Sequence, residues 1–176
     1  MRSRGVVKGS YILVFQLDRP LNAIAIGRLG CFDFVPGYYI YIGSAFGSGG
    51  LPARLAYHQR RYKAHPHWHI DYLRPFLNLC EIWTVGGPHR LECSWCELFA
   101  ANPALQRPVA GFGSRDTGCA SHLFFSARRP SLHLLTNTLL NSLNKHVNNG
   151  DELQIEVHAY DEDPSNGAGQ SFCACV

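Results

Sequence analysis

The sequence predicts an α+β domain in which a small antiparallel β-sheet, of three or more strands, is flanked by helices. Short apolar runs rich in β-branched and aromatic residues, such as 11–17 and 38–42, have the composition of strands. The stretches that join them are short and contain Asp, Pro, Asn and Gly, which favours antiparallel connections. Longer stretches with apolar residues at helical spacing occur between and after these runs, the clearest at 90–101.

We expect three strands and two helices in the first half of the chain. The predicted strands are residues 11–17, 23–26 and 38–42, and the predicted helices are residues 51–63 and 68–77. Pro75 is expected to end or kink the second helix, because its ring cannot continue an α-helix.

The second half is expected to complete the sheet and to add a C-terminal helix and strand. The predicted elements are strands at 81–85, 123–125 and 153–160, and helices at 90–101 and 132–147. We divide the chain into a domain of residues 1–130 and an extension of residues 131–176. The extension contains an acidic, polar segment that is expected to be partly disordered.

Composition limits the class of protein. The 176 residues suffice for one domain with a real core, and 46% are apolar. No apolar run reaches the roughly 18 residues of a membrane-spanning helix, so no membrane partner is expected. We interpret the cysteines, including Cys31, Cys80, Cys93, Cys96 and Cys119, as reduced thiols, which predicts a cytoplasmic protein. The net charge of +3 permits an anionic partner without requiring one.

Tyrosines recur on the first and third predicted strands. Tyr39 and Tyr41 are two residues apart and therefore share one face of a strand, which Tyr11 can join if the strands pair. Tyrosine is also an ordinary strand residue, so these phenols alone indicate no chemistry.

Arg54 and His58 are four residues apart in a predicted helix, so they are expected to project from it together while Leu55 faces the core. A guanidinium suits phosphate, and an imidazole can transfer a proton near neutral pH. A solvated surface pair is the simpler interpretation of the two residues in isolation.

Glu92 lies near the start of the helix predicted at 90–101. A glutamate there can merely complement the helix dipole. Beside tyrosine, arginine and histidine, its carboxylate can instead anchor Mg²⁺, which commonly binds through one or two carboxylates and shares phosphate oxygens.

Together these residues resemble the GIY-YIG nuclease superfamily. The wider match, over roughly residues 8–125, resembles one uncharacterised branch of small prokaryotic proteins, whose domain also occurs fused to endonuclease III-type DNA glycosylases. The motifs that carry the resemblance are Gly9-Ser10-Tyr11, 37–45 (GYYIYIGSA), Gly49-Gly50-Leu51, Arg54-Leu55, 67–73 (HWHIDYL), Glu92-Cys93, 111–114 (GFGS) and 121–124 (SHLF).

The resemblance implies a GIY-YIG-like fold and hydrolysis of DNA phosphodiester bonds with one divalent cation, Mg²⁺ or Mn²⁺, in DNA repair or processing. The residues it implies for catalysis are Tyr11, Tyr41, Arg54, His58 and Glu92, with Glu92 as the metal ligand. Arg54 would stabilise the transition state, and either tyrosine would deprotonate the attacking water with help from His58 or the cation.

The chain departs from the pattern of the superfamily in three places. The first tyrosine motif lies farther from the second, because an insertion around residues 24–30 adds a strand. No asparagine matches the one that follows the glutamate helix, and we expect the loop at 113–122 to take its place. In that loop the branch has Ser-Asp-Cys-x-Cys, whereas Thr117 stands near the first cysteine position and Cys119 at the second.

Further residues are predicted to contact substrate. The cluster His65–Asp71 (HPHWHID) places imidazoles beside Trp68, which is expected to pack in the core while Asp71 orients a histidine. Zinc is less favoured there, because the spacing of two cysteines and two histidines in zinc fingers is absent. The basic residues after His58 can follow a phosphate backbone or form a solvated surface. The predicted substrate contacts are Tyr39, Ser44, Arg60, Arg61, His67, His69 and His122.

Two other interpretations remain open. One is a nucleic-acid-binding module that keeps the fold and recognises branched or damaged DNA without cutting it. The other is a partner domain that retains only a vestigial cleft. Cys93-Ser94-Trp95-Cys96 has thioredoxin-type spacing, but it is expected inside a helix rather than at its start, which disfavours a redox site.

Overall fold

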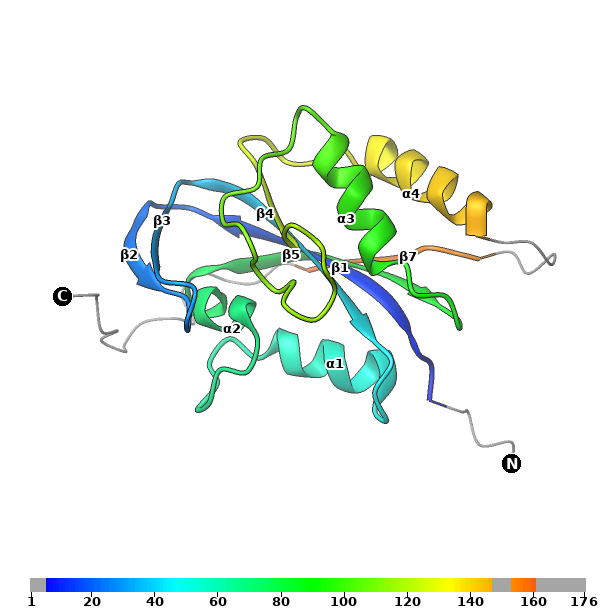
Figure 1. The fold of residues 1–176 in the computed structure, drawn as a ribbon, viewed down its shortest axis with the longest axis horizontal. Coiled ribbons are helices and arrows are strands. Elements are labelled where there is room, and N and C mark those ends of the chain that lie inside the picture. Colours follow the sequence, from blue (N-terminus) through cyan, green and yellow to red (C-terminus); the bar gives the residue numbers. More distant parts are fainter. Residues whose placement is uncertain (1–5, 147–152, 161–176) are drawn as a thin grey trace.

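A computed structural model describes residues 6–146 and 153–160 of the protein. A five-stranded antiparallel sheet forms its middle layer, in the order β6-β4-β1-β5-β7, with two helices on each face (Figure 1). The strands of this sheet are β1 (Gly9–Leu17), β4 (Gly37–Ala45), β5 (Asn78–Gly86), β6 (Leu123–Ser126) and β7 (Glu156–Ala159). The predicted α+β class, with an antiparallel sheet flanked by helices, is confirmed.

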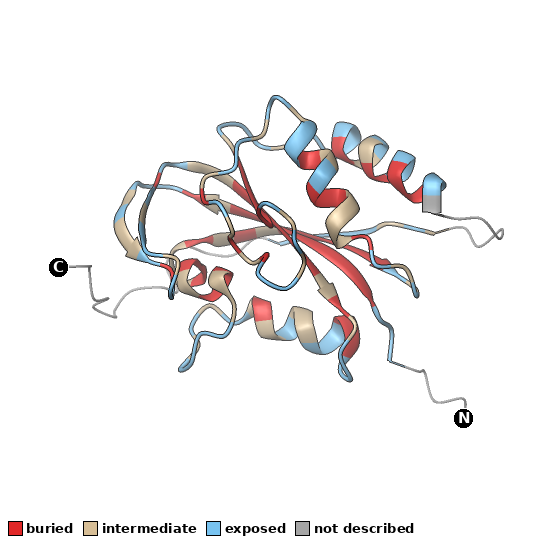
Figure 2. Ribbon diagram, viewed as in Figure 1, coloured by how far each residue is buried: buried red, intermediate tan, exposed pale blue. Residues whose placement is uncertain are grey.

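The central strand β1 pairs with β4 on one side, from Gly9 opposite Ala45 to Leu17 opposite Gly37, and with β5 on the other. Both of its faces are covered, so nearly all its residues are buried and its run of apolar side chains is continuous (Figure 2). This explains why the sequence signals a strand here by composition rather than by alternation.

Alternate residues of the sheet point to opposite faces and pack into two separate cores. One lies beneath the helices α1 (Gly50–Gln59) and α2 (His69–Leu73), and it contains Tyr11, Tyr39 and Tyr41. The shared face predicted for these three tyrosines is therefore correct. The other lies beneath the helices α3 (Glu92–Ala101) and α4 (Leu132–His146).

The second predicted strand does not join the main sheet. It forms β2 (Leu21–Ala25), which pairs only with β3 (Cys31–Phe34) in a separate two-stranded ribbon. Sequence reasoning did not predict β3 as an element, because it has only four residues and a mixed pattern of exposure. Gly27 has a positive φ of 50° in the connection, a conformation that glycine tolerates.

Helix α1 ends at Gln59, four residues before the predicted end at residue 63. The guanidinium of Arg74, which is fully buried, donates hydrogen bonds to the carbonyls of His58 and Gln59, at 2.8 and 3.0 Å. These are carbonyls of the last turn, which a helix leaves unpaired. Arg74 therefore caps α1 from a distant part of the chain, in the 3₁₀ turn Arg74–Phe76 around Pro75.

The predicted C-terminal extension packs onto the rest of the fold. Leu135, Leu139 and Leu143 of α4 are buried in the core beneath α3, and β7 pairs with β5 at the edge of the sheet. The disorder expected for residues 161–170 lies outside the described residues. No helix in the described ranges is both long and apolar enough to cross a membrane.

The cysteine prediction holds only in part. Cys80, Cys93, Cys96 and Cys119 carry reduced thiols. Cys31 is bonded in a disulfide, so the prediction of a reduced thiol is wrong at this position. Its local sequence contained no feature that distinguished it from the others.

Candidate functional site

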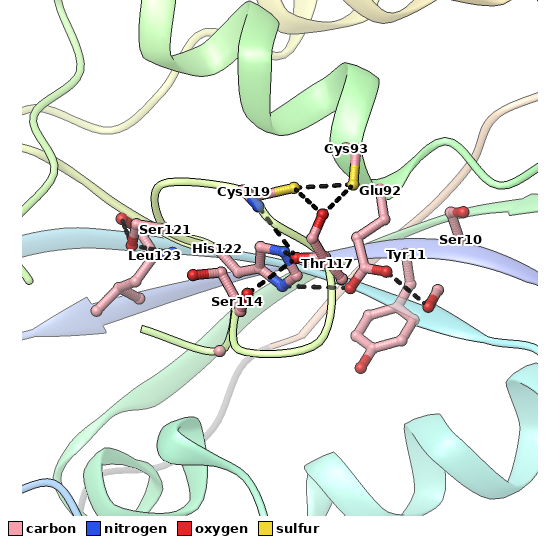
Figure 3. A network of polar contacts seen from close by, with 12 residues as sticks. Ser10, Tyr11, Glu92, Cys93, Ser114, Thr117, Cys119, Ser121, His122 and Leu123 are labelled. Atoms are coloured by element: carbon pink, nitrogen blue, oxygen red, sulfur yellow. Dashed lines mark hydrogen bonds and ion pairs between the residues drawn. The ribbon is translucent and has the colours of Figure 1, made fainter. Parts of the chain in front are cut away.

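The predicted catalytic residues come from four elements. Tyr11 lies on β1, Tyr41 on β4, Arg54 and His58 on α1, and Glu92 is the first residue of α3. The loop between α3 and β6 passes beside Glu92 and brings His122 next to it (Figure 3). Residues far apart in the sequence therefore meet at Glu92, where the start of α3, the end of β4 and this loop lie side by side.

Tyr11 and His58 form a buried pair. The Tyr11 hydroxyl lies 2.8 Å from His58 Nε2, and each residue is 1% exposed. Burial, and secondarily the cation of Lys63, lowers the pKa of His58 to about 3, so its ring is neutral at pH 7. Burial also raises the pKa of Tyr11 well above 10. At neutral pH the pair is thus an uncharged phenol bonded to an uncharged imidazole.

Tyr41 connects this pair to the two charged residues. Its ring centroid is 5.9 Å from that of His58. Burial raises the pKa of Tyr41, the Glu92 carboxylate raises it further, and the Arg54 guanidinium lowers it. Glu92 and Arg54 affect the pKa of Tyr11 in the same two directions. Because such effects fall off with distance, all five residues belong to one electrostatic neighbourhood.

Glu92 is held at both carboxylate oxygens. Ser44 Oγ donates to Oε2 at 2.8 Å, and His122 Nδ1 lies 3.2 Å from Oε1. Burial lowers the pKa of His122 despite the nearby carboxylate, so its ring is neutral at pH 7. A carboxylate only accepts hydrogen bonds, so Nδ1 carries the ring proton and donates it. The side chain of Glu92 remains 15% exposed, and each oxygen keeps a lone pair for another partner.

Arg54 stacks on Trp68, with its guanidinium carbon 4.0 Å from the ring centroid. Both residues line a surface cavity of about 270 Å³, together with the glycine-rich loop at 47–50 and Tyr57. Stacking fixes the plane of the guanidinium while its N–H groups remain available, since the side chain is only half-buried.

The model of the family described as "Domain of unknown function DUF123" matches residues 10–145. The chain belongs to this family. No curated protein and no solved structure gave a match.

His58 of this DUF123 domain lies differently from the prediction. It points into the core toward Tyr11, whereas Arg54 lies at the rim of the cavity on Trp68. The two side chains do not project together, although they lie one turn apart. Leu51 and His58, two turns apart, form the buried face of α1, so packing rather than the spacing of four residues decided the orientation.

The structure brings two of the predicted substrate contacts to Glu92, namely Ser44 and His122. Tyr39 is instead buried in the core, where its hydroxyl donates to the carbonyl of Val35 at 2.8 Å. Arg61 donates to the Leu77 carbonyl at 3.2 Å and thus braces the segment after α1. Arg60 is exposed.

Asp71 was predicted to orient a histidine ring, but its hydrogen-bond partners are other groups. Asp71 accepts hydrogen bonds from Lys63 at 2.6 Å, from Tyr57 at 3.0 Å and from backbone amides of residues 67 and 68. Burial opposes ionisation of Asp71, but these bonds outweigh it and hold its pKa below the ordinary value. Asp71 therefore secures the Trp68 platform rather than an imidazole ring.

His69 and His67, on either side of Trp68 in the sequence, have different roles. Nδ1 of His69 accepts a hydrogen bond from Gly113 N–H at 2.8 Å, which ties α2 to the loop beside Glu92. His67 is exposed, and its ring packs edge-on against Trp68, with centroids 4.5 Å apart. His69 thus supports the site, whereas His67 is accessible to a ligand.

Sequence reasoning missed the role of Gly43. It lies directly opposite Tyr11 in the register of β1 and β4, and a Cβ at this position would clash with the Tyr11 ring. A glycine two residues after Tyr41 in a strand of β-branched and aromatic residues was the available signal.

The two cysteines of α3 have thiols of low acidity. Burial raises the pKa of the Cys93 thiol to about 11 and also raises that of Cys96. A reactive thiol requires the opposite shift, because the thiolate is the nucleophile.

Proposed function

We propose that this protein is a divalent-metal-dependent endonuclease that hydrolyses DNA phosphodiester bonds, in DNA repair or processing. The observation that carries the proposal is that the Glu92 carboxylate lies beside Tyr11 (Figure 3), whose hydroxyl lies 2.8 Å from His58, one turn of helix from Arg54. A hydrophobic core has no need of this arrangement, whereas phosphodiester hydrolysis needs a cation site, a phosphate ligand and a proton acceptor.

Glu92 fits the role of cation ligand. It offers hard oxygen donors, it is partly exposed, and Ser44 and His122 orient it while leaving lone pairs available. Mg²⁺ or Mn²⁺, when bound, neutralises charge on the scissile phosphate and stabilises the leaving oxygen. One carboxylate suffices if waters and phosphate oxygens complete the coordination sphere.

Arg54 is suited to bind the scissile phosphate. Its stacking on Trp68 restricts the guanidinium before substrate arrives, so less entropy is lost on binding. A planar fork of donors can then bind two phosphate oxygens and stabilise the additional negative charge of the transition state.

Tyr11 and His58 are suited to accept the proton of the attacking water. The neutral His58 ring can accept a hydrogen bond from Tyr11 across 2.8 Å and so orient the phenol oxygen that takes the proton of water, but its pKa of about 3 makes the ring a weak acceptor of the proton itself. Arg54 lowers the pKa of Tyr11, which is the direction that this role requires. Tyr41 is the alternative base, since Arg54 lowers its pKa as well.

DNA is the proposed partner. Branched or damaged DNA is included in this proposal, because the surface cavity beside Arg54 and Trp68 can admit an irregular backbone. Arg60, Arg90 and Arg115 are exposed, and His67 is accessible beside Trp68, so cations and an aromatic surface are available for phosphates and bases. Because the substrate would be DNA, we also propose a cytoplasmic location.

The buried phenols favour one alternative function. Burial raises the pKa of both Tyr11 and Tyr41, which opposes formation of the base. A nucleic-acid-binding module that keeps the GIY-YIG fold and cuts nothing would have no need for a phenolate.

Incubation of the purified chain with supercoiled and branched DNA, in Mg²⁺, Mn²⁺ or EDTA, separates the two functions. Metal-dependent nicking that Glu92→Gln and Arg54→Ala each reduce by about 100-fold or more supports the nuclease. Glu97→Gln, an exposed carboxylate on the same helix, and Arg28→Ala, an exposed arginine on the β2–β3 ribbon, should cut normally. Salt-sensitive binding without nicking supports the alternative, and neither binding nor nicking contradicts both.

A further inference from the structure

Three thiols and an imidazole gather on the side of Glu92 away from the phenols. The ligand atoms of Cys96, Cys119 and His122 all lie within 4.8 Å of one another. Cys93 Sγ lies 2.8 Å from Cys119 Sγ and so adds a third sulfur (Figure 3). The proposed nuclease chemistry uses none of these sulfur atoms.

The spacing of these residues is that of two short metal-binding pairs. Cys93 and Cys96 are separated by two residues, and so are Cys119 and His122, with a longer stretch between the pairs. The first pair lies in the first turn and a half of α3, and the second leads into β6. The first pair thus comes from a packed helix, and the second from the loop that ends at β6.

We propose that Cys93, Cys96, Cys119 and His122 bind one Zn²⁺ ion as a structural site. Three sulfurs and one imidazole nitrogen form a soft donor set, which selects zinc over Mg²⁺ or Ca²⁺. Four protein ligands fill a tetrahedron and leave no position for a substrate, which distinguishes a structural zinc from a catalytic one.

His122 has the correct nitrogen available for this role. Nδ1 donates to Glu92, so the lone pair is on Nε2, which now lies 2.9 Å from Thr117 Oγ1. Thr117 Oγ1 also lies 3.3 Å from the Ser114 carbonyl, to which it can donate when Nε2 binds the metal. A carboxylate–histidine–zinc relay of this kind is common around zinc ions.

The distance between Cys93 and Cys119 requires only a small adjustment, whereas Cys93 must move closer to the other two ligands, because only Cys96, Cys119 and His122 already lie within 4.8 Å of one another. With Zn–S bonds of about 2.3 Å, two sulfurs of a tetrahedral site lie about 3.8 Å apart. Cys93 and Cys119 would therefore separate by about 1 Å. Apart from their contact with each other, the two thiols make long contacts to the Thr117 carbonyl, at 3.7 and 3.9 Å, so little is lost when they move.

The cluster is accessible to an ion, and its charge can be balanced. It borders a cavity of about 200 Å³ that Arg107 and Glu97 also line. Binding would release three thiol protons to solvent and leave three thiolates around Zn²⁺, a net charge of −1 beside Arg107. The bound ion would fasten the loop before β6 to α3 and so hold His122 against Glu92.

Metal content tests the proposal independently of nuclease activity. The full chain is purified under reducing conditions, loaded with Zn²⁺ and dialysed against excess Mg²⁺. About one zinc ion per chain is expected to remain, and Co²⁺ in its place should give the absorption of a tetrahedral thiolate complex. Cys96→Ser and Cys119→Ser should bind zinc at least about 100-fold more weakly, whereas Cys80→Ser, a thiol outside the cluster, should bind it normally.

If a cysteine variant does not fold, the wild-type chain alone still tests the proposal. Its affinity for Zn²⁺ is measured by competition with a zinc-sensitive dye. A folded wild-type chain that takes up no Zn²⁺ overturns the proposal. Equal zinc affinity of Cys96→Ser, Cys119→Ser and the wild type also overturns it. So does a Cys93–Cys119 disulfide that persists under reducing conditions and prevents zinc binding.

Discussion

Each face of the central sheet is covered by one helix of ten residues, α1 on one face and α3 on the other, and these two helices bury different chemistry. α1 buries Leu51 and the imidazole of His58, whereas α3 buries Trp95, Cys96 and Phe99.

The α1 face buries a pair of polar rings. Tyr11 and His58 satisfy each other there, yet His58 Nδ1 has no hydrogen-bond partner among the described residues. Such an atom costs stability whether or not function requires it. On the α3–α4 face Trp95 Nε1 likewise has no partner among the described residues and the Glu81 carboxylate is buried, but the rest of that core is apolar, so we interpret it as the main source of stability.

The largest effect on stability is expected on the α4 side. Leu139 is fully buried, so Leu139→Ala should lower the free energy of unfolding by about 2–5 kcal/mol without changing cleavage by the folded protein. Leu134→Ala, at a position 67% exposed on the same helix, should stay within about 0.5 kcal/mol. Urea denaturation measures both, and equal losses would contradict the assignment of the core.

On the other face, a double-mutant cycle can isolate the buried polar pair. Tyr11→Phe or His58→Phe alone should each cost about 1–3 kcal/mol, because the partner is left unsatisfied. The double variant should cost less than the sum of the two, while every variant should lose cleavage. Additive losses would mean that the 2.8 Å contact contributes no coupling.

The same pair predicts how stability depends on pH. His58 has a pKa of about 3 in the folded chain and about 6.5 when unfolded, so protons bind the unfolded state preferentially between these values. Stability should fall as the pH drops below 6.5, by up to about 1.4 kcal/mol per pH unit from this residue. The pKa values of His69 and His122 are also lowered, so the comparison is with the Tyr11→Phe/His58→Phe chain, whose slope should be shallower. Identical slopes in urea titrations at pH 7.5 to 4.5 would refute the buried neutral imidazole.

The smallest effect is expected for a polar contact at the edge of the α3–α4 face. Arg129 donates to Glu81 at 2.8 Å, but the Arg129 side chain is 57% exposed and Glu81 also accepts from Trp83 at 3.0 Å. Arg129→Ala should cost about 0.5–1 kcal/mol, since solvent and the indole N–H continue to satisfy the carboxylate. A loss as large as that for Leu139→Ala would show that this face also depends on buried charge.

Much of the fold could be predicted, because its strands and helices are locally consistent. The apolar run of β1 and the helical spacing of α3 are visible without knowledge of their neighbours. The end of α1 was not visible, since Arg74 caps it from a separate segment. The pairing of β2 with β3 outside the main sheet was likewise a matter of tertiary contacts.

The candidate site divides in the same way. Residue types and the family resemblance selected Tyr11, Tyr41, Arg54, His58 and Glu92 in advance, and the electrostatic neighbourhood that they share is a finding of the structure. The inward direction of His58, the bracing role of Arg61 and the sulfur cluster beside Glu92 were not foreseen.

The sequence by itself determined which chemical groups are present and which local segments form strands and helices, because composition and periodicity act over a few residues. Only the tertiary structure decided which groups touch, since packing chooses the face that a helix buries. It turned the His58 imidazole toward a phenol 47 positions away. It also set His122 between a carboxylate and a group of thiols.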